Sequence, residues 1–392
     1  MKTRQTYRFY PTPEQAQHLN RTFGCVRFVS NYALRARTDA WRAGGRMGYP
    51  ETDRALTALK ATPEHAWLNE VSSVCLQQAL RDLQTAFVNF FEKRARYPTY
   101  KRRQARQSAN YSERGFSFDP ETRTLKLAKI GRIKVKWSRK EIPKPSSIRV
   151  IRTASGKYFV SLVVDTESKP LPKTSKAIGI DFGVARLATL SNGERIANPK
   201  HGAQHAKRLA YYQKCLARKQ KGSNRRAKAK RRVAIAHEKI ANSRGDSLHK
   251  LCTDLVSRFD VICVEDLNLR GMVKNHSLAR ALSDASIGTA IRMLEEKAAR
   301  YGKRVVKIDR FFPSSKLCSC CGQVVESLPL DIREWTCTCG AHHDRDENAA
   351  KNILAAGQAV TAHGAGVRAV RPKGRKASRR RSANQGSEHA KA

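Results

Sequence analysis

The chain has 392 residues, 40% of them hydrophobic, so its length suggests two or three domains with a sizeable core. Lys and Arg number 77 against 33 Asp and Glu, giving a formal net charge of +44. Such an excess indicates a polyanionic partner, most commonly nucleic acid, with an anionic membrane surface as the weaker alternative. No apolar stretch approaches the ~18 residues of a spanning helix, which argues against a membrane protein.

The N-terminal residues carry no apolar signal segment, so we expect the chain to stay in a reducing cytoplasm. Residues 12–97 are predicted to form a small helical region. Thr12, Pro13 and Gln15 form a helix start with a capping box. A second helix follows Ser73, where apolar residues recur at spacings of three and four, which is typical of a helix face that packs into a core.

Short stretches of alternating apolar and polar residues follow Pro98 and indicate strands of a small barrel, including a hairpin that turns at Ser155–Gly156. A basic segment with tyrosines joins the helices to these strands. It is typical of a surface where cations contact a phosphate backbone and bases stack on tyrosine, although an ordinary basic linker is the alternative. The candidate nucleic-acid contacts in this segment are Tyr97, Tyr100, Lys101, Arg102 and Arg103.

A Pro- and Lys-rich linker before residue 177 marks a domain boundary, and a buried strand and a hairpin turning at Asn192–Gly193 follow it. Residues 207–232 hold 12 Lys or Arg and no acid. A helix there would have too little apolar surface to pack well alone, so a nucleic-acid partner is plausible beside the simpler interpretation of a solvated face. The candidate contacts are Arg225, Arg226, Lys228, Lys230, Arg231 and Arg232.

Five of the ten cysteines lie between Cys318 and Cys339, a clustering typical of a metal site in a reducing compartment. Two short pairs each end in Cys-Gly, as in the knuckles of a tetrahedral zinc site. The proposed ligands are Cys318, Cys321, Cys337 and Cys339. The second pair is one residue shorter than CxxC, so Cys320, His342 and His343 remain rival ligands, and free thiols are the remaining alternative.

Carboxylates follow two predicted buried strands and begin a predicted helix. Asp181 ends one strand, Glu265 ends another, and Asp344 and Asp346 precede an apolar helical stretch. Each alone is weak evidence, because an acid in a first turn often only offsets the helix dipole. Together they are the set that a two-metal phosphodiester site requires, with Mg²⁺ or Mn²⁺ bound by oxygen ligands. A hairpin strand, a later parallel strand and a helix form an RNase H-like arrangement.

The stretches "YRFYPTPEQ", "IGIDFG", "VICVEDLNLRGM", "FFPSSKLCSCCG" and "WTCTCGAHHDRDENAAKNI" together resemble the TnpB family of transposon-encoded proteins over residues 4–356. The resemblance implies an RNA-guided DNA endonuclease related to type V CRISPR effectors, with a guide RNA from the element's end and a double-stranded DNA target. Asp181, Glu265 and Asp346 match its three RuvC acids. A monomer with RNA is expected, with a dimer as the alternative, in the nucleoid of a prokaryotic cell.

The resemblance also implies an α+β multidomain fold. Residues 1–11 and 98–170 would form a wedge-like β-barrel, with the helical recognition lobe at 12–97 inserted. Residues 171–312 and 342–360 would form the RuvC-like α/β nuclease domain, with the zinc finger at 313–341 inserted. Residues 361–392 hold nine Lys or Arg and one acid and are predicted to be a disordered tail.

Three other functions compete with RNA-guided cutting. A strand-transfer transposase also uses three acids on an RNase H-like fold, but an inserted zinc finger and a wedge-like N-terminus argue against it. A non-cleaving RNA-guided repressor predicts the loss of one or more acids, and all three are present. A zinc-ribbon RNA-binding protein leaves Asp181 and Glu265 without a role.

Overall fold

The structure is a computed structural model that describes residues 1–168, 170–329 and 331–362. It divides into two compact units. The first comprises Met1–Pro172, Lys200–Asp254 and Glu296–Lys303, and the second comprises Lys173–Pro199, Leu255–Glu295 and the described chain from Arg304 on. The predicted tail begins inside the last helix, which ends at Ala362, and its residues 363–392 lie outside the described part.

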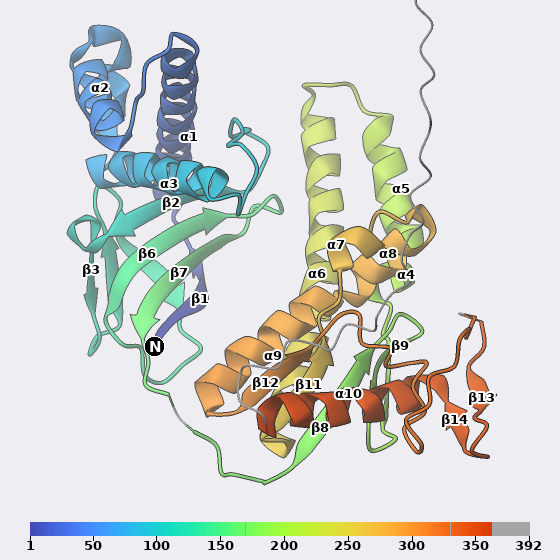
Figure 1. Ribbon diagram of the computed structural model, residues 1–392. Helices are drawn as coiled ribbons and strands as arrows, with labels where there is room; N and C mark the ends of the chain where they lie inside the picture. Colours follow the sequence, from blue (N-terminus) through green and yellow to red (C-terminus); the bar gives the residue numbers. More distant parts are fainter. Residues whose placement is uncertain (169, 330, 363–392) are drawn as a thin grey trace, which may run out of the picture. The chain divides into compact units, whose positions relative to one another are not determined.

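A seven-stranded antiparallel sheet forms the centre of the first unit, in the order β2-β6-β7-β1-β5-β4-β3. The edge strands β2 and β3 are consecutive in the chain and are joined only by the short 3₁₀ turn Glu113–Gly115, so the sheet curls into a nearly closed barrel (Figure 1). This confirms the predicted barrel. The strands are β1 (Lys2–Tyr10), β2 (Gln107–Ser112), β3 (Phe116–Asp119), β4 (Thr124–Leu127), β5 (Gly131–Lys136), β6 (Pro145–Arg152) and β7 (Tyr158–Asp165).

Helices pack at one end of this barrel and share its hydrophobic core. They are α1 (Pro13–Arg42), α2 (Tyr49–Ala61), the 3₁₀ helix η1 (Pro63–Glu70) and α3 (Ser73–Phe91). The predicted capping box is present, because the Thr12 hydroxyl accepts from the Gln15 N–H and the Gln15 side chain accepts from the Thr12 N–H. Leu76, Leu80 and Phe87 of α3 are buried, as their spacing predicts.

The basic segment forms helices α4 (His201–Gln204), α5 (Ala206–Ala217) and α6 (Asn224–Arg258). Residues 200–254 group with the first unit, whereas the predicted boundaries assigned them to the nuclease domain. The reason is a set of contacts from α6 to the barrel's β6–β7 turn. The Arg231 guanidinium donates to the Ser155 carbonyl over 3.0 Å, and Lys157 pairs with Glu238 at 3.0 Å.

The second unit contains a five-stranded sheet in the order β10-β9-β8-β11-β12. Strands β8 (Ala177–Phe182), β9 (Arg186–Leu190) and β10 (Arg195–Ala197) form an antiparallel meander, and β11 (Val261–Glu265) and β12 (Arg304–Ile308) run parallel to β8. The remaining helices are α7 (Leu269–Met272), α8 (His276–Ala285), α9 (Ile287–Tyr301) and α10 (Arg345–Ala362).

Helix α10 lies directly against this sheet, and glycine permits the close approach (Figure 1). A Cβ on Gly179 of β8 would lie 2.1 Å from the Ala350 carbonyl oxygen of α10. A Cβ on Gly357 of α10 would lie 2.2 Å from the Cys263 sulfur of β11. Because these two glycines lack a side chain, α10 can pack very closely against β8 and β11.

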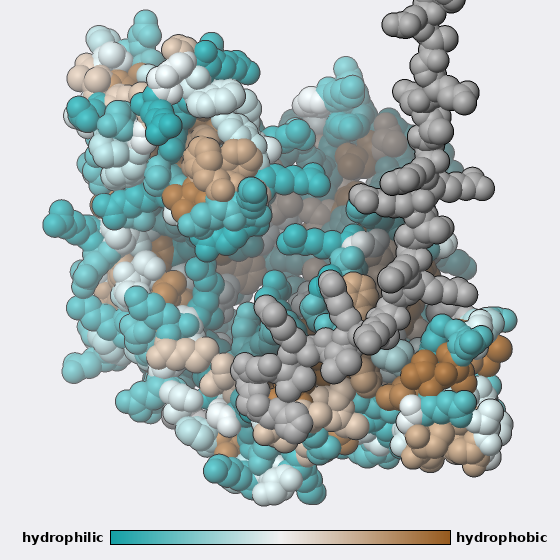
Figure 2. Space-filling model, in the orientation of Figure 1, coloured by the Kyte–Doolittle hydropathy of each residue, from teal (hydrophilic) through white to brown (hydrophobic). Residues whose placement is uncertain are grey.

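A small lobe precedes α10 and contains the antiparallel strands β13 (Glu334–Thr336) and β14 (His342–Asp344). Its core consists of Cys318, Leu328, Trp335 and Cys337. The lobe's hairpin continues to Asp344, three residues past the predicted limit of the finger. Hydrophobic side chains gather on this lobe, whereas most of the visible surface elsewhere is hydrophilic (Figure 2).

Within the described residues, no helix has the length and apolarity needed to cross a membrane.

Candidate active site and metal centre

Asp181 and Glu265 lie on the sheet face that α10 covers. The parallel register pairs Gly179 with Cys263 and Ile180 with Val264, so Asp181 and Glu265 follow at the ends of adjacent strands. Side chains alternate between faces with a period of two. Since Gly179 and Cys263 both face α10, Asp181 and Glu265 project toward the same side, near the start of that helix. Asp346 lies in the first turn of α10.

The three acids are close enough to repel one another. Burial, followed by the charges of Glu265 and Asp346, raises the pKa of Asp181 to about 7 against a smaller opposing effect of Arg345 and Arg333. The acids do not form a tight cluster, because among the described residues only cysteines and a histidine form groups of three ligand atoms all within 4.8 Å of one another. The arrangement is therefore a looser set in which the Glu265 and Asp346 carboxylates act on Asp181 through their charge.

Asp344 and Asp346 differ in their surroundings. The Asp344 carboxylate accepts from the backbone N–H groups of Asp346 and Glu347, each over 3.0 Å, so Asp344 is the N-cap of α10. Burial opposes ionisation of Asp344, but the Glu347 N–H and the arginines Arg186 and Arg195 outweigh it and lower its pKa.

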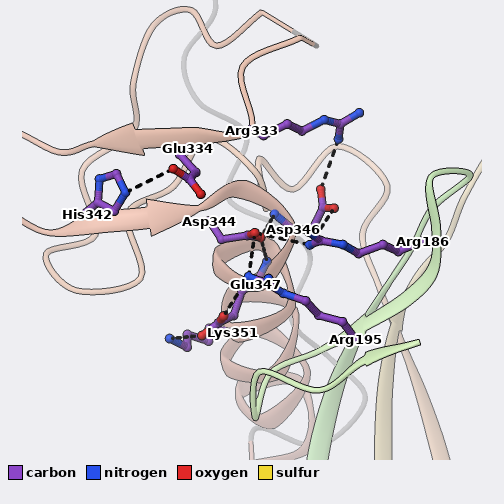
Figure 3. A network of polar contacts seen from close by, with 9 residues as sticks. All are labelled: Arg186, Arg195, Arg333, Glu334, His342, Asp344, Asp346, Glu347 and Lys351. Carbon is purple, nitrogen blue, oxygen red and sulfur yellow. Dashed lines mark hydrogen bonds and ion pairs between the residues drawn. The ribbon is translucent and has the colours of Figure 1, made fainter. Parts of the chain in front are cut away.

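Two arginines from the β9–β10 hairpin hold Asp344 (Figure 3). Arg195 lies 2.9 Å and Arg186 3.3 Å from one of its oxygens. Asp346 has longer contacts, 3.5 Å to Arg333 and 3.9 Å to Arg186. Asp344 thus joins the hairpin to the start of α10, while among the described residues the Asp346 carboxylate has only these longer contacts.

Ser314 contacts the second acid. Its hydroxyl donates to Glu265 Oε1 in a short hydrogen bond, and Arg310 forms a close ion pair with the neighbouring Asp266. Ser314, Arg186 and Arg195 were not among the site residues predicted from the sequence. No periodic pattern in the sequence marks these residues. The one signal was that Ser314 follows shortly after β12, the strand that runs parallel to β11, which ends in Glu265.

The four predicted cysteines meet at one point. Cys318 Sγ lies 3.8 Å from Cys339 Sγ, and Cys321 Sγ lies 3.6 Å from Cys337 Sγ; the four sulfurs all lie within 4.8 Å of one another. Sulfurs placed about 2.3 Å from a tetrahedral zinc ion would be about 3.8 Å apart. The donor set and its spacing therefore fit a zinc ion.

The short second pair has a backbone explanation. In the first knuckle, the Gly322 N–H donates to the Cys318 carbonyl, whereas in the second the Gly340 N–H donates to the Cys337 carbonyl. The second turn therefore closes over three residues and the first over four, so one residue fewer is needed. Both glycines have positive φ, 76° and 85°, as the Cys-Gly pattern predicts.

The rival ligands have distinct positions. Cys320 is exposed, yet it forms a second potential group with Cys318 and His343. His343 is buried and lies 3.0 Å from the Cys318 sulfur. Burial opposes ionisation of the Cys318 thiol. The backbone N–H groups of Cys321 and Cys320 and the His343 side chain outweigh this effect and lower the pKa of Cys318 to about 5. His342 is exposed on β14 and faces Glu334 instead (Figure 3).

The predicted tyrosine-containing segment lines a groove of about 810 Å³ against α1. Tyr100, Lys101 and Arg102 all belong to this groove, and the Asn31 side chain holds the segment there, because it donates to the Lys101 carbonyl and accepts from the Lys101 N–H. Tyr97 is less available for stacking, because its ring packs edge-on against Phe87 and Phe90. Arg103 is exposed beside the groove.

The six basic candidates of α6 fall into two groups. Arg226 donates to the carbonyls of Leu216 and Lys219 over 2.9 and 2.7 Å, which closes the end of α5. Arg231 holds the β6–β7 turn, and Lys230 bonds closely to Gln104. The remaining three candidates are exposed, and within the described chain their side chains form no hydrogen bond or ion pair with the protein: Arg225, Lys228 and Arg232.

Three family profiles match the chain. One described as "Probable transposase" covers residues 161–276, one described as "Cas12f1-like, TNB domain" covers residues 288–353, and one described as "Helix-turn-helix domain" covers residues 1–46. The last description does not fit the structure, where residues 1–46 contain strand β1 and the single helix α1.

Full-length relatives are also similar. A "Putative RNA-guided DNA endonuclease" of Streptomyces pristinaespiralis is 50% identical over 94% of this chain and 92% of its own. A "Putative RNA-guided DNA endonuclease InsQ" of Escherichia coli (strain K12) is 32% identical over 95% and 97%. The solved "Cas12f1-sgRNA-target DNA complex" matches 88% of this chain and 83% of that one with a TM-score of 0.54 at 13% identity, which supports the fold alone.

Proposed function

The chain belongs to the TnpB family of transposon-encoded proteins, and on that premise we propose that it is an RNA-guided DNA endonuclease that cuts by metal-dependent phosphodiester hydrolysis. The observation that carries the proposal is that Asp181 and Glu265, at the ends of adjacent strands, project toward the start of α10, where Asp346 lies in the first turn. The relatives' names support the guide RNA and the DNA target as partners.

The residues fit divalent cations of the Mg²⁺ or Mn²⁺ type. Three carboxylates supply the hard oxygen ligands that these ions prefer, and the charges of Glu265 and Asp346 add to burial in raising the pKa of Asp181. When bound, such ions would stabilise the charge that develops on the attacking and leaving oxygens. Asp181, Glu265 and Asp346 would hold them, while Arg186 and Arg333 would release Asp346 as cationic charge enters.

Zinc is the proposed occupant of the four-cysteine site, with Cys318, Cys321, Cys337 and Cys339 as ligands. A closed set of four thiolates leaves no position for substrate, so its role is structural. His343 would donate a hydrogen bond to the Cys318 sulfur, as second partners of metal ligands commonly do.

The remaining parts of the chain would hold nucleic acid. The barrel with residues 12–97 would bind the guide and its target as wedge and recognition lobe. The groove lined by Tyr100, Lys101 and Arg102 and the exposed cations of α6 supply sequence-independent phosphate contacts. We expect one chain per RNA, with a dimer as the alternative, to be decided by the mass of the complex.

The test uses protein purified with its RNA and a target DNA that carries the guide's complement. Cutting should need Mg²⁺ or Mn²⁺ and stop with Asp181→Ala, Glu265→Ala or Asp346→Ala, while DNA binding persists. Joining of DNA ends without RNA would favour the transposase instead. RNA-dependent binding without any cut under all metal conditions would favour the repressor.

A further inference from the structure

Ser314 and Glu265 are joined in a way that the three-acid site does not by itself explain. Ser314 is buried, at 6% exposed, and its hydroxyl donates to Oε1 of Glu265. Within the described residues, Oε2 has no hydrogen-bond partner. One oxygen of this carboxylate is therefore fixed by the protein and the other is left free.

The backbone of Ser314 is held in turn by a buried amide on α10. Asn352, at 3% exposed, donates through Nδ2 to the Ser314 carbonyl over 2.8 Å and to the Leu317 carbonyl over 2.6 Å. Asn is a poor choice for the interior of a helix, and burying its amide is costly unless both its donors and its acceptor are used. Its neighbours Ala349, Ala350 and Ile353 are apolar, so Asn352 departs from the local pattern.

Asn348, one turn earlier, holds the next part of the same loop. Its side chain accepts from the Ser319 N–H over 3.0 Å and donates to the Leu317 carbonyl over 2.7 Å. Asn348 does not contact Ser314. The two asparagines share the Leu317 carbonyl as an acceptor, but only Asn352 reaches Ser314 and only Asn348 reaches Ser319.

We propose that Ser314 and Asn352 are positioning residues for Glu265, and that they fix one carboxylate oxygen so that the other faces the metal ion. The inference rests on the proposed nuclease function. A loop that follows a strand end is mobile by default, whereas ligand geometry must hold to within about 0.5 Å. The hydrogen bonds from Asn352 to Ser314 and from Ser314 to Glu265 supply that rigidity. Asn352 lies on α10, the same helix that carries Asp346.

The test compares Ser314→Thr with Ser314→Val, which have the same shape and differ only in the hydroxyl. Mn²⁺ affinity is measured on the RNA-bound protein by the electron paramagnetic resonance signal of free Mn²⁺, and the Mg²⁺ dependence of cutting is measured in parallel. Ser314→Val should weaken Mn²⁺ binding by about 10- to 100-fold, as loss of a ligand's hydrogen-bond partner typically does, and Ser314→Thr should retain most of it.

Asn352→Ala should weaken Mn²⁺ binding to a similar extent. Asn348→Ala serves as its control, because it also removes a bond to the Leu317 carbonyl but keeps the bond to Ser314, and it should leave Mn²⁺ affinity near wild type. Bound zinc, measured on every variant, shows that the cysteine lobe is intact. Equal Mn²⁺ affinity for Ser314→Val and Ser314→Thr, or equal effects of the two asparagine variants, would overturn the inference.

Glu265→Ala separates this inference from the proposed function. If Glu265→Ala lowers Mn²⁺ affinity but Ser314→Val does not, only the positioning role fails. If Glu265→Ala leaves Mn²⁺ binding unchanged, the metal site itself is wrong and both proposals fail.

Discussion

The carboxylate of Asp344 lies 3.0 Å from the backbone nitrogen of Asp346, so the first of these acids caps the helix that carries the second. Asp346→Ala should abolish cutting and spare DNA binding, because it removes a metal ligand but no phosphate contact. Asp344→Ala should instead cost about 1 kcal/mol of stability, as loss of an N-cap does. Asp344→Asn keeps a capping side chain and should cut measurably. Cutting by Asp346→Ala, with Asp344→Asn inactive, would reverse the assignment.

Asp181 should make stability depend on pH when Mg²⁺ and Mn²⁺ are absent. Its pKa is raised from the ordinary 3.8 to about 7, so between these values the folded protein keeps a proton that the unfolded chain has released. Stability should therefore fall as pH rises from about 4 to 7 and level off above 7. Denaturant unfolding across this range tests it, with Asp181→Asn as the control that lacks this contribution. Added Mg²⁺ should stabilise wild type more at pH 8 than at pH 6, since the ion competes with the proton.

Two helical glycines should respond oppositely to alanine. A Cβ at Gly357 would meet the Cys263 sulfur at 2.2 Å, so Gly357→Ala should destabilise by about 1–3 kcal/mol. A Cβ at Gly24 of α1 meets nothing within 4 Å, so Gly24→Ala should stabilise by roughly 0.5–1 kcal/mol through its helix propensity. Unfolding midpoints of the two variants give the signs directly. A neutral Gly357→Ala would mean that α10 does not approach β11 so closely.

Zinc analysis should find one tightly held ion per chain purified without chelators. Cys337→Ser should abolish it and unfold the lobe around Trp335, because metal binding and folding are coupled at such sites. Cys320→Ser should be mild, since this exposed thiol lies outside the four-sulfur group. Loss of zinc in Cys320→Ser but not in Cys321→Ser would show that Cys320, and not Cys321, is the zinc ligand.

The cations of α6 should separate into those that bind nucleic acid and those that bind the protein itself. Replacing Arg225 and Arg232 with Gln should reduce the slope of log affinity against log salt by about 0.7–0.9 for each phosphate that is no longer neutralised, without changing stability. Replacing Arg226 and Arg231 removes the same charge but also breaks hydrogen bonds to carbonyls. That second pair should lower the unfolding midpoint. In neither variant should target choice change, because guide pairing determines it in proteins of this kind.

The sequence predicted those features of the site that have a local pattern. Alternating strands, acids at strand ends and Cys-Gly knuckles all follow from residues close together in the chain, and the structure contains each of them. The resemblance selected Asp346 over Asp344, a choice that spacing alone left open.

Long-range contacts between side chains and backbone were not predictable. Asn352 reaches the Ser314 carbonyl 38 residues away, and Arg195 reaches Asp344 across 149 residues. Such bonds need one polar atom at one place and leave no periodicity in the sequence. For the same reason the attachment of α6 to the barrel, through Arg231 and Ser155, gave no signal in the sequence. The expected boundaries placed residues 200–254 with the nuclease domain, whereas the structure groups them with the first compact unit.

The position of α10 after every strand of the sheet it covers has a consequence for synthesis. Asp181 leaves the ribosome 165 residues before Asp346, a delay of roughly 8–33 s at about 5–20 residues per second. Throughout that interval β8, joined by β11 once Glu265 has been added, lacks the helix that buries Gly179 and Cys263, so we expect the nascent sheet to expose apolar surface until α10 is complete. A prematurely terminated chain that ends before α10 would carry two of the three acids on an uncovered sheet, and we expect it to aggregate and not to cut.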